Sequence, residues 1–226
     1  MRPLIIMNGE KIDWFHTVIR MLMYLAGVAV LALGMSLQTA SGLGVATLTC
    51  FATTLSMLTG KTLGFWITAT YVAYIVAQFT ILRREFQSRI LLELCFSTLI
   101  GGFTDFFMAV NPLHPAALPI QVETMLLSLA VTAFGVSLVV NMGVVPNAPD
   151  GLVQVIAEKI KRRFGDVKVV FDCSHVAVSL VLSLALMHNL GGFGVTTAIS
   201  ALFLDHVINI ANKLFAQRFV RAAFGK

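Results

Sequence analysis

Charged residues are scarce in this chain. Only 12% of its 226 residues are Asp, Glu, Lys or Arg, whereas 58% are hydrophobic and the mean hydropathy is +0.87. Soluble domains contain about 25% charged and about 45–50% apolar residues. The composition therefore excludes an ordinary soluble domain and predicts a membrane protein.

Sequence motifs of soluble enzymes are also absent. The chain has no Walker loop, HExxH, GxSxG or dinucleotide fingerprint. Its three cysteines, Cys50, Cys95 and Cys173, show no CxxC or Cys/His spacing, so they are interpreted as packing residues. We expect no enzyme activity, no cofactor and no metal. The net charge of +5 is explained by cytoplasmic loops that face anionic lipid, so no nucleic acid is expected as a partner.

Six segments are long and apolar enough to cross a bilayer. A hydrocarbon core about 30 Å thick requires about 20 helical residues. Three windows of that length carry no charge, and three more carry one or more ionisable groups. The expected spans are residues 21–40, 63–82, 90–110, 125–146, 173–190 and 191–212.

Two shorter stretches, 46–60 and 149–163, are rejected as full spans. The first has only 15 residues, and the second carries six charges. Each is predicted to form a re-entrant half-helix or an interfacial helix. In the second stretch, one helical face is apolar, which favours the interface. That face consists of Val153, Ile156, Ile160 and Phe164.

The chain repeats itself at an offset of 101 residues. The segment 32–37 (ALGMSL) matches 133–138 (AFGVSL), and Gly64 matches Gly165. Near the end of each half the offset is 100, because Asp105 matches Asp205. Each copy contains three spans, and since three is odd, the second copy must be inverted in the membrane. Inverted repeats are a common scaffold of secondary transporters.

The distribution of Lys and Arg predicts the orientation. With six spans and a cytoplasmic N-terminus, 15 of the 16 basic residues lie on the cytoplasmic side and only Lys61 lies outside. An eight-span alternative places about 13 inside by the same charge rule, so the segment lengths decide for six. The predicted organisation is a cytoplasmic N-terminal segment (1–16), repeat 1 (17–110), an extracytoplasmic linker (111–120), repeat 2 (121–213) and a cytoplasmic tail (214–226).

Glycine and proline interrupt the chain directly after the first span of each repeat. Helix breaks in a membrane free backbone polar groups, which must line a cavity or find partners on a neighbouring helix. The break residues are Gly42 and Gly44 in the first copy and Gly143, Pro146, Pro149 and Gly151 in the second. Nearby polar residues are predicted either to bind substrate or an ion, or to satisfy the freed backbone groups. They are Ser41, Thr47, Asn141, Asn147 and Asp150. Asn147 and Asp150 could instead cap the helix that follows them.

Ionisable residues within the spans are further candidates. A charged group in a span costs about 2.5–3.5 kcal/mol, so it normally faces a cavity, a partner or a proton path. We expect Asp205 to have such a role, with His175 as a candidate partner from the preceding span. Asp105 is either functional or simply at the outer interface. Glu93, one turn past Arg89, is expected to be an interfacial residue with a local ion-pair partner.

Three motifs resemble those of a known family. They are GLGV after the first span, PNAPDGL at the matching place in the second copy, and GGFGVTTAISALFLDHV near the end. Over residues 24–212 the chain resembles the YczE/YitT-like integral membrane proteins of bacteria, whose corresponding stretches tend to read GlGxxPxDxL, PxDGL and GxGT. The residues that match this pattern are Pro149, Asp150, Gly151, Leu152, Gly192, Gly194 and Thr196.

The chain departs from the family pattern at two places. Leu48 and Thr49 stand where the first copy would have Pro and Asp, and Val195 interrupts the Gly-Thr pair. The resemblance implies a multi-pass protein of the bacterial inner membrane but does not identify a substrate.

The sequence therefore predicts an all-α protein with six transmembrane helices in two inverted three-helix repeats, each with a short re-entrant or interfacial helix after its first span. The expected function is secondary transport of a small solute by alternating access, in which Asp205 or Asp150 takes up a coupling proton or cation. The alternatives are a membrane-embedded substrate-binding subunit of a larger transporter and a non-transporting regulator or scaffold. Expected partners are membrane lipids, the solute, and either a second copy or a partner subunit.

Overall fold

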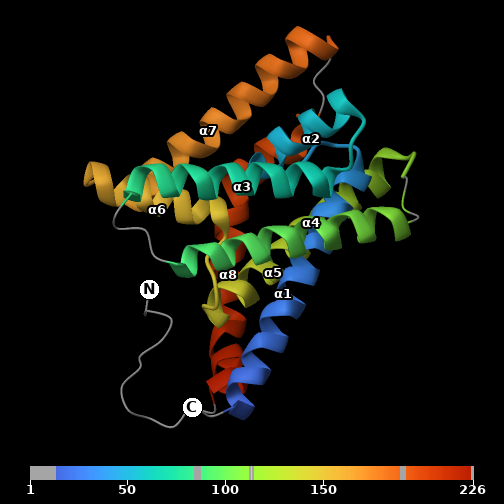
Figure 1. Cartoon of the computed structure of the whole chain (residues 1–226). Helices are drawn as coiled ribbons and strands as arrows, with labels where there is room; N and C mark the ends of the chain where they lie inside the picture. Colours follow the sequence, from blue (N-terminus) through green and yellow to red (C-terminus); the bar gives the residue numbers. More distant parts are fainter. Residues whose placement is uncertain (1–13, 84–87, 112, 114, 189–191, 225–226) are drawn as a thin grey trace.

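The described part of the computed structural model is all-helical, and the predicted fold class is confirmed (Figure 1). The structure describes residues 14–83, 88–111, 113, 115–188 and 192–224. The predicted N-terminal segment 1–16 falls almost entirely outside these residues. The helices are α1 (Trp14–Ser41), α2 (Thr47–Thr59), α3 (Leu63–Leu82), η2 (Ser88–Leu91), α4 (Leu92–Val110), α5 (Leu118–Met142), α6 (Ala148–Ile160), α7 (Phe164–Leu182), η3 (Ser183–Met187) and α8 (Val195–Phe224).

Six helices are long and apolar enough to cross a membrane, which confirms the predicted number of spans. They are α1, α3, α4, α5, α7 with its π-helical continuation η3, and α8. The two short helices α2 and α6 have 13 residues each, so each is only about 20 Å long. They stand where the sequence predicted helices too short to span.

The helix ends follow from local chemistry. The Thr62 hydroxyl accepts a hydrogen bond from the Phe65 N–H (3.2 Å) and caps the start of α3. Helix α5 ends at Gly143, whose left-handed backbone (φ 54°) favours glycine. Pro149 lies in the first turn of α6, where a missing N–H costs nothing. The interruption of the helix between α5 and α6 is therefore formed by glycine and proline, as predicted.

The fifth span begins earlier than predicted. Its expected start was residue 173, but α7 begins at Phe164 and includes Lys168 and Asp172. These two residues are one turn apart and form an ion pair (3.4 Å). Pairing offsets part of the cost of placing both charges in a membrane helix, whereas a hydropathy window counts each charge separately.

Helices α1 and α5 form the centre of the molecule and run antiparallel. Leu31 lies against Gly135, Gly34 lies against Thr132, and Arg20, near the start of α1, contacts Met142 at the end of α5. Both glycines allow close approach, because a Cβ on Gly34 would collide with Thr132 Oγ1 and one on Gly135 would meet the Leu31 nitrogen at 2.6 Å. Leu31 and Thr132, like Gly34 and Gly135, are 101 residues apart. The two contacts are therefore related as by a two-fold axis.

The other helices follow the same two-fold pattern with one exception. Each short helix packs against the second span of the other half, so α2 contacts α7 and α6 contacts α3. Likewise α1 packs on α4, and α5 packs on α8. Helix α3 packs along α4, but α7 has no comparable packing on α8 within the described residues. Figure 1 shows α7 at the edge of the molecule, projecting away from the other helices.

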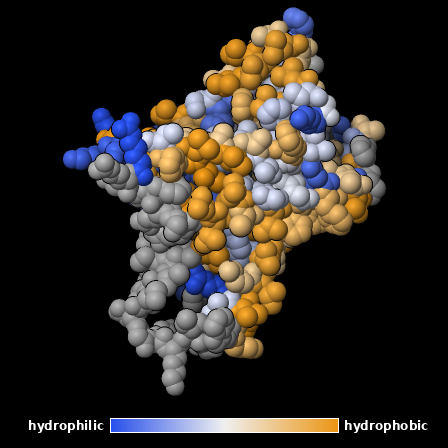
Figure 2. Space-filling view, in the orientation of Figure 1, coloured by the Kyte–Doolittle hydropathy of each residue, from blue (hydrophilic) through white to orange (hydrophobic). Residues whose placement is uncertain are grey.

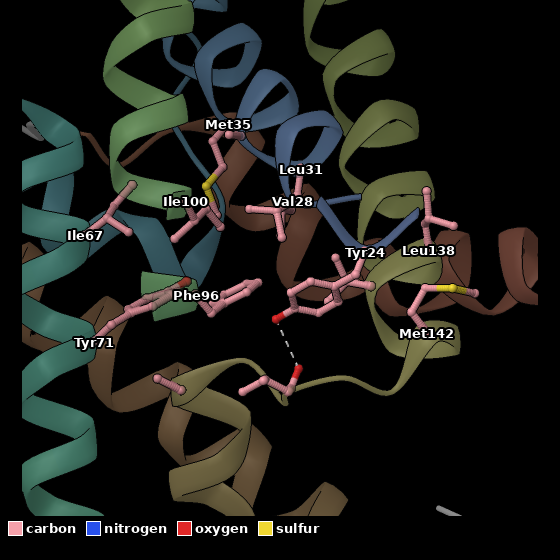
Figure 3. Packing of buried hydrophobic residues seen from close by; sticks show 14 of the residues in the cluster. Tyr24, Val28, Leu31, Met35, Ile67, Tyr71, Phe96, Ile100, Leu138 and Met142 are labelled. Carbon is pink, nitrogen blue, oxygen red and sulfur yellow. Dashed lines mark hydrogen bonds between the residues drawn. The ribbon is translucent and has the colours of Figure 1, made fainter. Parts of the chain in front are cut away.

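The buried core lies around the middle of α1, from Tyr24 to Met35. Tyr24, Tyr71 and Phe96 bring three rings together from α1, α3 and α4 (Figure 3). The Tyr71 and Phe96 rings stack with centroids 6.5 Å apart. Outside this core, large apolar side chains are exposed on every span, and Figure 2 shows them over much of one face. Such a surface is expected where helices face lipid.

Candidate functional site

Two buried polar groups without a regular hydrogen bond meet where the start of α6 packs on α3. The Asn147 Oδ1 and Tyr71 hydroxyl atoms are buried side by side, and neither has a partner of good geometry among the described residues. Asn147 is the N-cap residue of α6, but its side chain makes no capping bond. The capping interpretation of Asn147 is therefore wrong, because its side chain is directed at Tyr71 of α3 instead. Unsatisfied buried polar groups are uncommon and mark candidate binding positions.

Asp150 takes part in a charge cluster between α6 and α7. Lys168 Nζ lies 3.2 Å from Asp150 Oδ1 and 3.4 Å from Asp172 Oδ2. The Lys168 side chain is only 17% exposed, so the ion pairs are shielded from solvent more than surface pairs are. Asp205 of α8 also acts electrostatically on Lys168. Two carboxylates, those of Asp150 and Asp172, therefore share the Lys168 ammonium group.

A hydrogen bond joins α3 and α7 beside this cluster. The Tyr74 hydroxyl and His175 Nε2 are 2.5 Å apart, and His175 Nδ1 is 2.8 Å from the Phe171 carbonyl oxygen. Since a carbonyl only accepts, Nδ1 carries the hydrogen, and in the neutral ring Nε2 accepts from the Tyr74 hydroxyl. Tyr74 and His175 are 101 residues apart, so they occupy equivalent positions in the two halves.

A hollow of about 140 Å³ opens next to this hydrogen bond. The Phe51 and Phe171 rings both contact His175, with centroids 6.2 Å and 4.3 Å from its ring. The lining of the hollow is mostly apolar. It consists of Phe51, Thr70, Ala73, Tyr74, Ser174, His175 and Val178. Small-molecule pockets usually have volumes of about 300–1,000 Å³, so this hollow by itself is smaller than a typical ligand site.

Glu93 lies in a second polar contact, between α3, α4 and α6. The side chain is 2% exposed, and its Oε2 accepts a hydrogen bond from Gln78 Nε2 at 2.7 Å. The same amide nitrogen lies 3.3 Å from the Ala148 carbonyl oxygen at the start of α6. The expectation that Glu93 is interfacial is therefore wrong, because the helix turns this carboxyl inward against α6.

The break between α1 and α2 is held by hydrogen bonds. Gln38 Oε1 accepts from the Ala46 N–H (3.0 Å), and the Ser41 hydroxyl donates to the Gln38 carbonyl (2.7 Å). Val45 N–H donates to the Gly192 carbonyl (3.1 Å). Ser41 therefore satisfies freed backbone, as one alternative predicted, and Thr47 is buried at the start of α2.

The remaining break glycines pack closely or adopt special backbone conformations. Gly44 has φ 101°, and a Cβ there would meet the Gly194 nitrogen at 2.6 Å. Gly42 has φ 69°, and a Cβ on Gly151 would lie 2.9 Å from Glu93 Oε1. Pro146 lies exposed in the connection between α5 and α6.

Three other predicted residues have local partners. Asp105 Oδ1 accepts a hydrogen bond from the Gly64 N–H (2.7 Å) and so caps the start of α3 from α4. Asn141 Nδ2 donates to Asn212 Oδ1 (2.8 Å) and links α5 to α8. Asp205 is exposed on α8, and no contact between Asp205 and His175 occurs among the described residues. Its only link to the candidate site is a long-range electrostatic interaction with Lys168.

Sequence reasoning missed Lys168, Asp172, Tyr74, Gln78 and Glu93 as members of these contacts. The repeat itself could have indicated Tyr74, because it lies at the offset of 101 from His175, which was named. The spacing of four residues between Lys168 and Asp172 was a second available signal.

A family model for a family of unknown function, DUF6198, matches residues 18–213. The chain belongs to this family. The matched segment runs from the first turns of α1 into α8, so DUF6198 is defined by both halves together rather than by one. No curated protein and no solved structure matches the chain.

Proposed function

We propose that this protein is a secondary transporter of a small solute that works by alternating access of two inverted repeats. Antiparallel packing of the equivalent helices α1 and α5 supports the inversion. The observation that carries the proposal is the contact between Tyr74 and His175, because equivalent residues of inverted repeats meet only on their two-fold axis. Transporters of this architecture bind their solute near that axis.

The difference between the halves supports alternating access. If two repeats share one fold but pack differently, exchanging their conformations moves the opening from one side of the membrane to the other. Here α3 packs on α4, whereas α7 stands away from α8. We infer that the solute enters beside α7 and that the Asp150, Lys168 and Asp172 cluster supplies its polar contacts.

The proposed location is the bacterial inner membrane, with both termini cytoplasmic. The distribution of Lys and Arg supports this orientation, and the resemblance to YczE/YitT-like proteins supports the location.

The test begins with a thermal-shift screen of the purified protein against amino acids, organic acids, vitamins and organic cations. A solute that binds only the folded protein raises its apparent stability. The positive solute is then used in proteoliposome uptake with wild-type protein, with Asp150→Asn, and with Gly102→Ala as a control. A Cβ added at Gly102 would have nothing within 4 Å, so this substitution disturbs no contact.

We expect saturable uptake by the wild type and by Gly102→Ala, and a loss of at least about tenfold for Asp150→Asn. A tenfold loss corresponds to about 1.4 kcal/mol of interaction free energy. Binding without uptake would contradict the proposal and would indicate a substrate-binding subunit that needs a partner.

A further inference from the structure

The Glu93 carboxyl has an unusual environment for an acidic side chain in a membrane protein. Its Oε2 has one donor, the Gln78 amide. Its Oε1 faces the backbone of Gly151, since a Cβ at that position would lie only 2.9 Å away. No Lys or Arg forms an ion pair with Glu93 among the side chains that the structure describes. Burial without a cation disfavours the carboxylate relative to the neutral acid, and the Gln78 donor offsets only part of that effect.

The groups that face Glu93 come from three elements. Tyr24 of α1 lies within electrostatic reach, and its hydroxyl points at the Val145 carbonyl (Figure 3; 3.5 Å). Helix α3 contributes Gln78 and α6 contributes Gly151. The nearest guanidinium on α1, that of Arg20, donates instead to the Met142 and Gly143 carbonyls at 2.6 Å and 2.8 Å. Among the described residues of these elements, no basic side chain forms an ion pair with Glu93.

The equivalent junction in the other half is built differently. There the connection between α1 and α2 is joined to the start of α8 by backbone hydrogen bonds, from Val45 N–H to the Gly192 carbonyl and from Thr196 N–H to the Leu43 carbonyl (3.0 Å). A Cβ on Gly194 would collide with the Leu43 carbonyl oxygen, so the two backbones are in contact.

At the junction of α6 with α3 and α4, side chains replace these backbone bonds. The Gln78 amide bridges the Glu93 carboxyl and the Ala148 carbonyl. Backbone hydrogen bonds do not change with pH, whereas a carboxyl does. One of the two junctions thus contains a titratable group, and the other contains none among its described residues.

We propose that Glu93 is a proton-binding site that controls whether the start of α6 stays packed against α3 and α4. While the carboxyl carries its proton, the junction is neutral and closed. When the O–H bond breaks and the proton passes to water, the remaining carboxylate needs hydration, and the start of α6 moves away to admit water. Gly151 is the point at which α6 contacts the carboxyl, because a Cβ there would lie 2.9 Å from Glu93 Oε1 and the Glu93 side chain would have to shift.

If the protein is a transporter, Glu93 in place of Asp205 would be the carboxyl that couples proton movement to transport. This coupling role rests on the proposed function. Proton binding itself does not, since it can be measured without a solute. The two proposals therefore fail separately.

The direct test is infrared spectroscopy of the protein in lipid bilayers as the pH is raised. The protonated carboxyl has a carbonyl stretching band that the carboxylate lacks. We expect a band at neutral pH that titrates in the wild type, persists in Asp205→Asn and is absent in Glu93→Gln. The assignment is overturned if the band survives in Glu93→Gln or if the wild type shows no protonated carboxyl.

A second variant guards against misfolding of Glu93→Gln. Gln78→Leu removes the donor that stabilises the carboxylate, so the midpoint of the band should move to higher pH by about one unit. An unchanged midpoint contradicts the proposed contact. Repeating the titration in sodium and in choline chloride separates the ions, because a midpoint that depends on sodium would make Glu93 a sodium ligand and overturn the proton assignment.

Movement of α6 is tested by chemical labelling. Ala148→Cys is placed in a chain whose three native cysteines are replaced by alanine, and its reaction with a water-soluble maleimide is followed with pH. Ala148 is fully buried in the closed junction. Labelling should rise with pH when Glu93 is present and stay low when it is Gln. Equal labelling of both proteins at every pH would remove the coupling to α6.

Discussion

Tyr74 and His175 hold the same position in the two halves of the chain, and their side chains hydrogen-bond to each other at 2.5 Å. In the inverted repeat that we propose, two equivalent residues can contact each other only on the axis that relates the halves. This contact links α3 to α7 beside the hollow, although the two helices otherwise stand apart. Its removal should therefore affect both stability and the geometry of the hollow.

We predict that Tyr74→Phe lowers the free energy of unfolding by about 1 kcal/mol, because it leaves His175 Nε2 without its donor. Tyr71→Phe is the matched control, since the Tyr71 hydroxyl has no regular hydrogen bond and its loss should be nearly neutral. Unfolding by SDS in mixed micelles provides the measurement. In a double-mutant cycle with His175→Phe, the double variant should lose about 1 kcal/mol less stability than the sum of the two single losses. Strict additivity would show that the hydrogen bond contributes nothing.

Lys168 should be more important for stability than either of its aspartates alone. Replacing Lys168 with Met leaves Asp150 and Asp172 facing each other without a cation, and we expect a loss of about 1–2 kcal/mol. This value is below the about 3–5 kcal/mol of fully buried pairs, because the aspartate side chains are 36% and 24% exposed. The double variant with Asp150→Asn should recover part of the loss in the same SDS assay. A double variant less stable than Lys168→Met would contradict the charge cluster.

The crossing of α1 and α5 should not tolerate a larger residue at Gly34. An added methyl group would collide with Thr132, so Gly34→Ala must push the two central helices apart at a cost of about 1–3 kcal/mol. Gly102→Ala is again the control, because it meets nothing and removes a glycine from the interior of α4. Thermal unfolding in detergent measures both. Equal unfolding temperatures for the two variants would argue against the tight crossing.

The orientation predicts opposite accessibility of two loop positions. In a cysteine-free chain, Lys61→Cys should react with an impermeant reagent added outside intact cells, whereas Arg83→Cys should react only after the membrane is opened. Lys61 lies between α2 and α3, and Arg83 follows α3. If Arg83→Cys were also labelled from outside, the number of spans between residues 61 and 83 would have to be even. That result would contradict the proposed inverted repeats.

Length and composition predicted the spans well because the bilayer imposes a minimum number of apolar residues on any crossing helix. Glycine and proline likewise placed the break before α6, because Gly143 can adopt the left-handed conformation that ends α5 and Pro149 fits the first turn of α6. These are local properties, so they can be recognised without knowing which helices touch. The start of α7 was missed because Lys168 is paired there, with Asp172 one turn away and with Asp150 of α6, and the contact with α6 cannot be recognised from local sequence.

The candidate site depended on such distant contacts and was predicted less completely. Glu93 was assigned to the interface from its spacing to Arg89, but its partner is Gln78 on another helix. Asp105 was left open between two roles, and its contact with the Gly64 N–H shows a cap. Asp205 was favoured because it lies mid-span, yet it is exposed, because helix periodicity alone cannot tell which side of α8 faces a partner.

The paired contacts Gly34 with Thr132 and Leu31 with Gly135 have the geometry of an isologous dimer contact, in which each partner offers the same patch to the other. The present single chain thus resembles two small proteins fused end to end. Severing the connection after α4 should accordingly yield fragments that find each other again when made in the same cell.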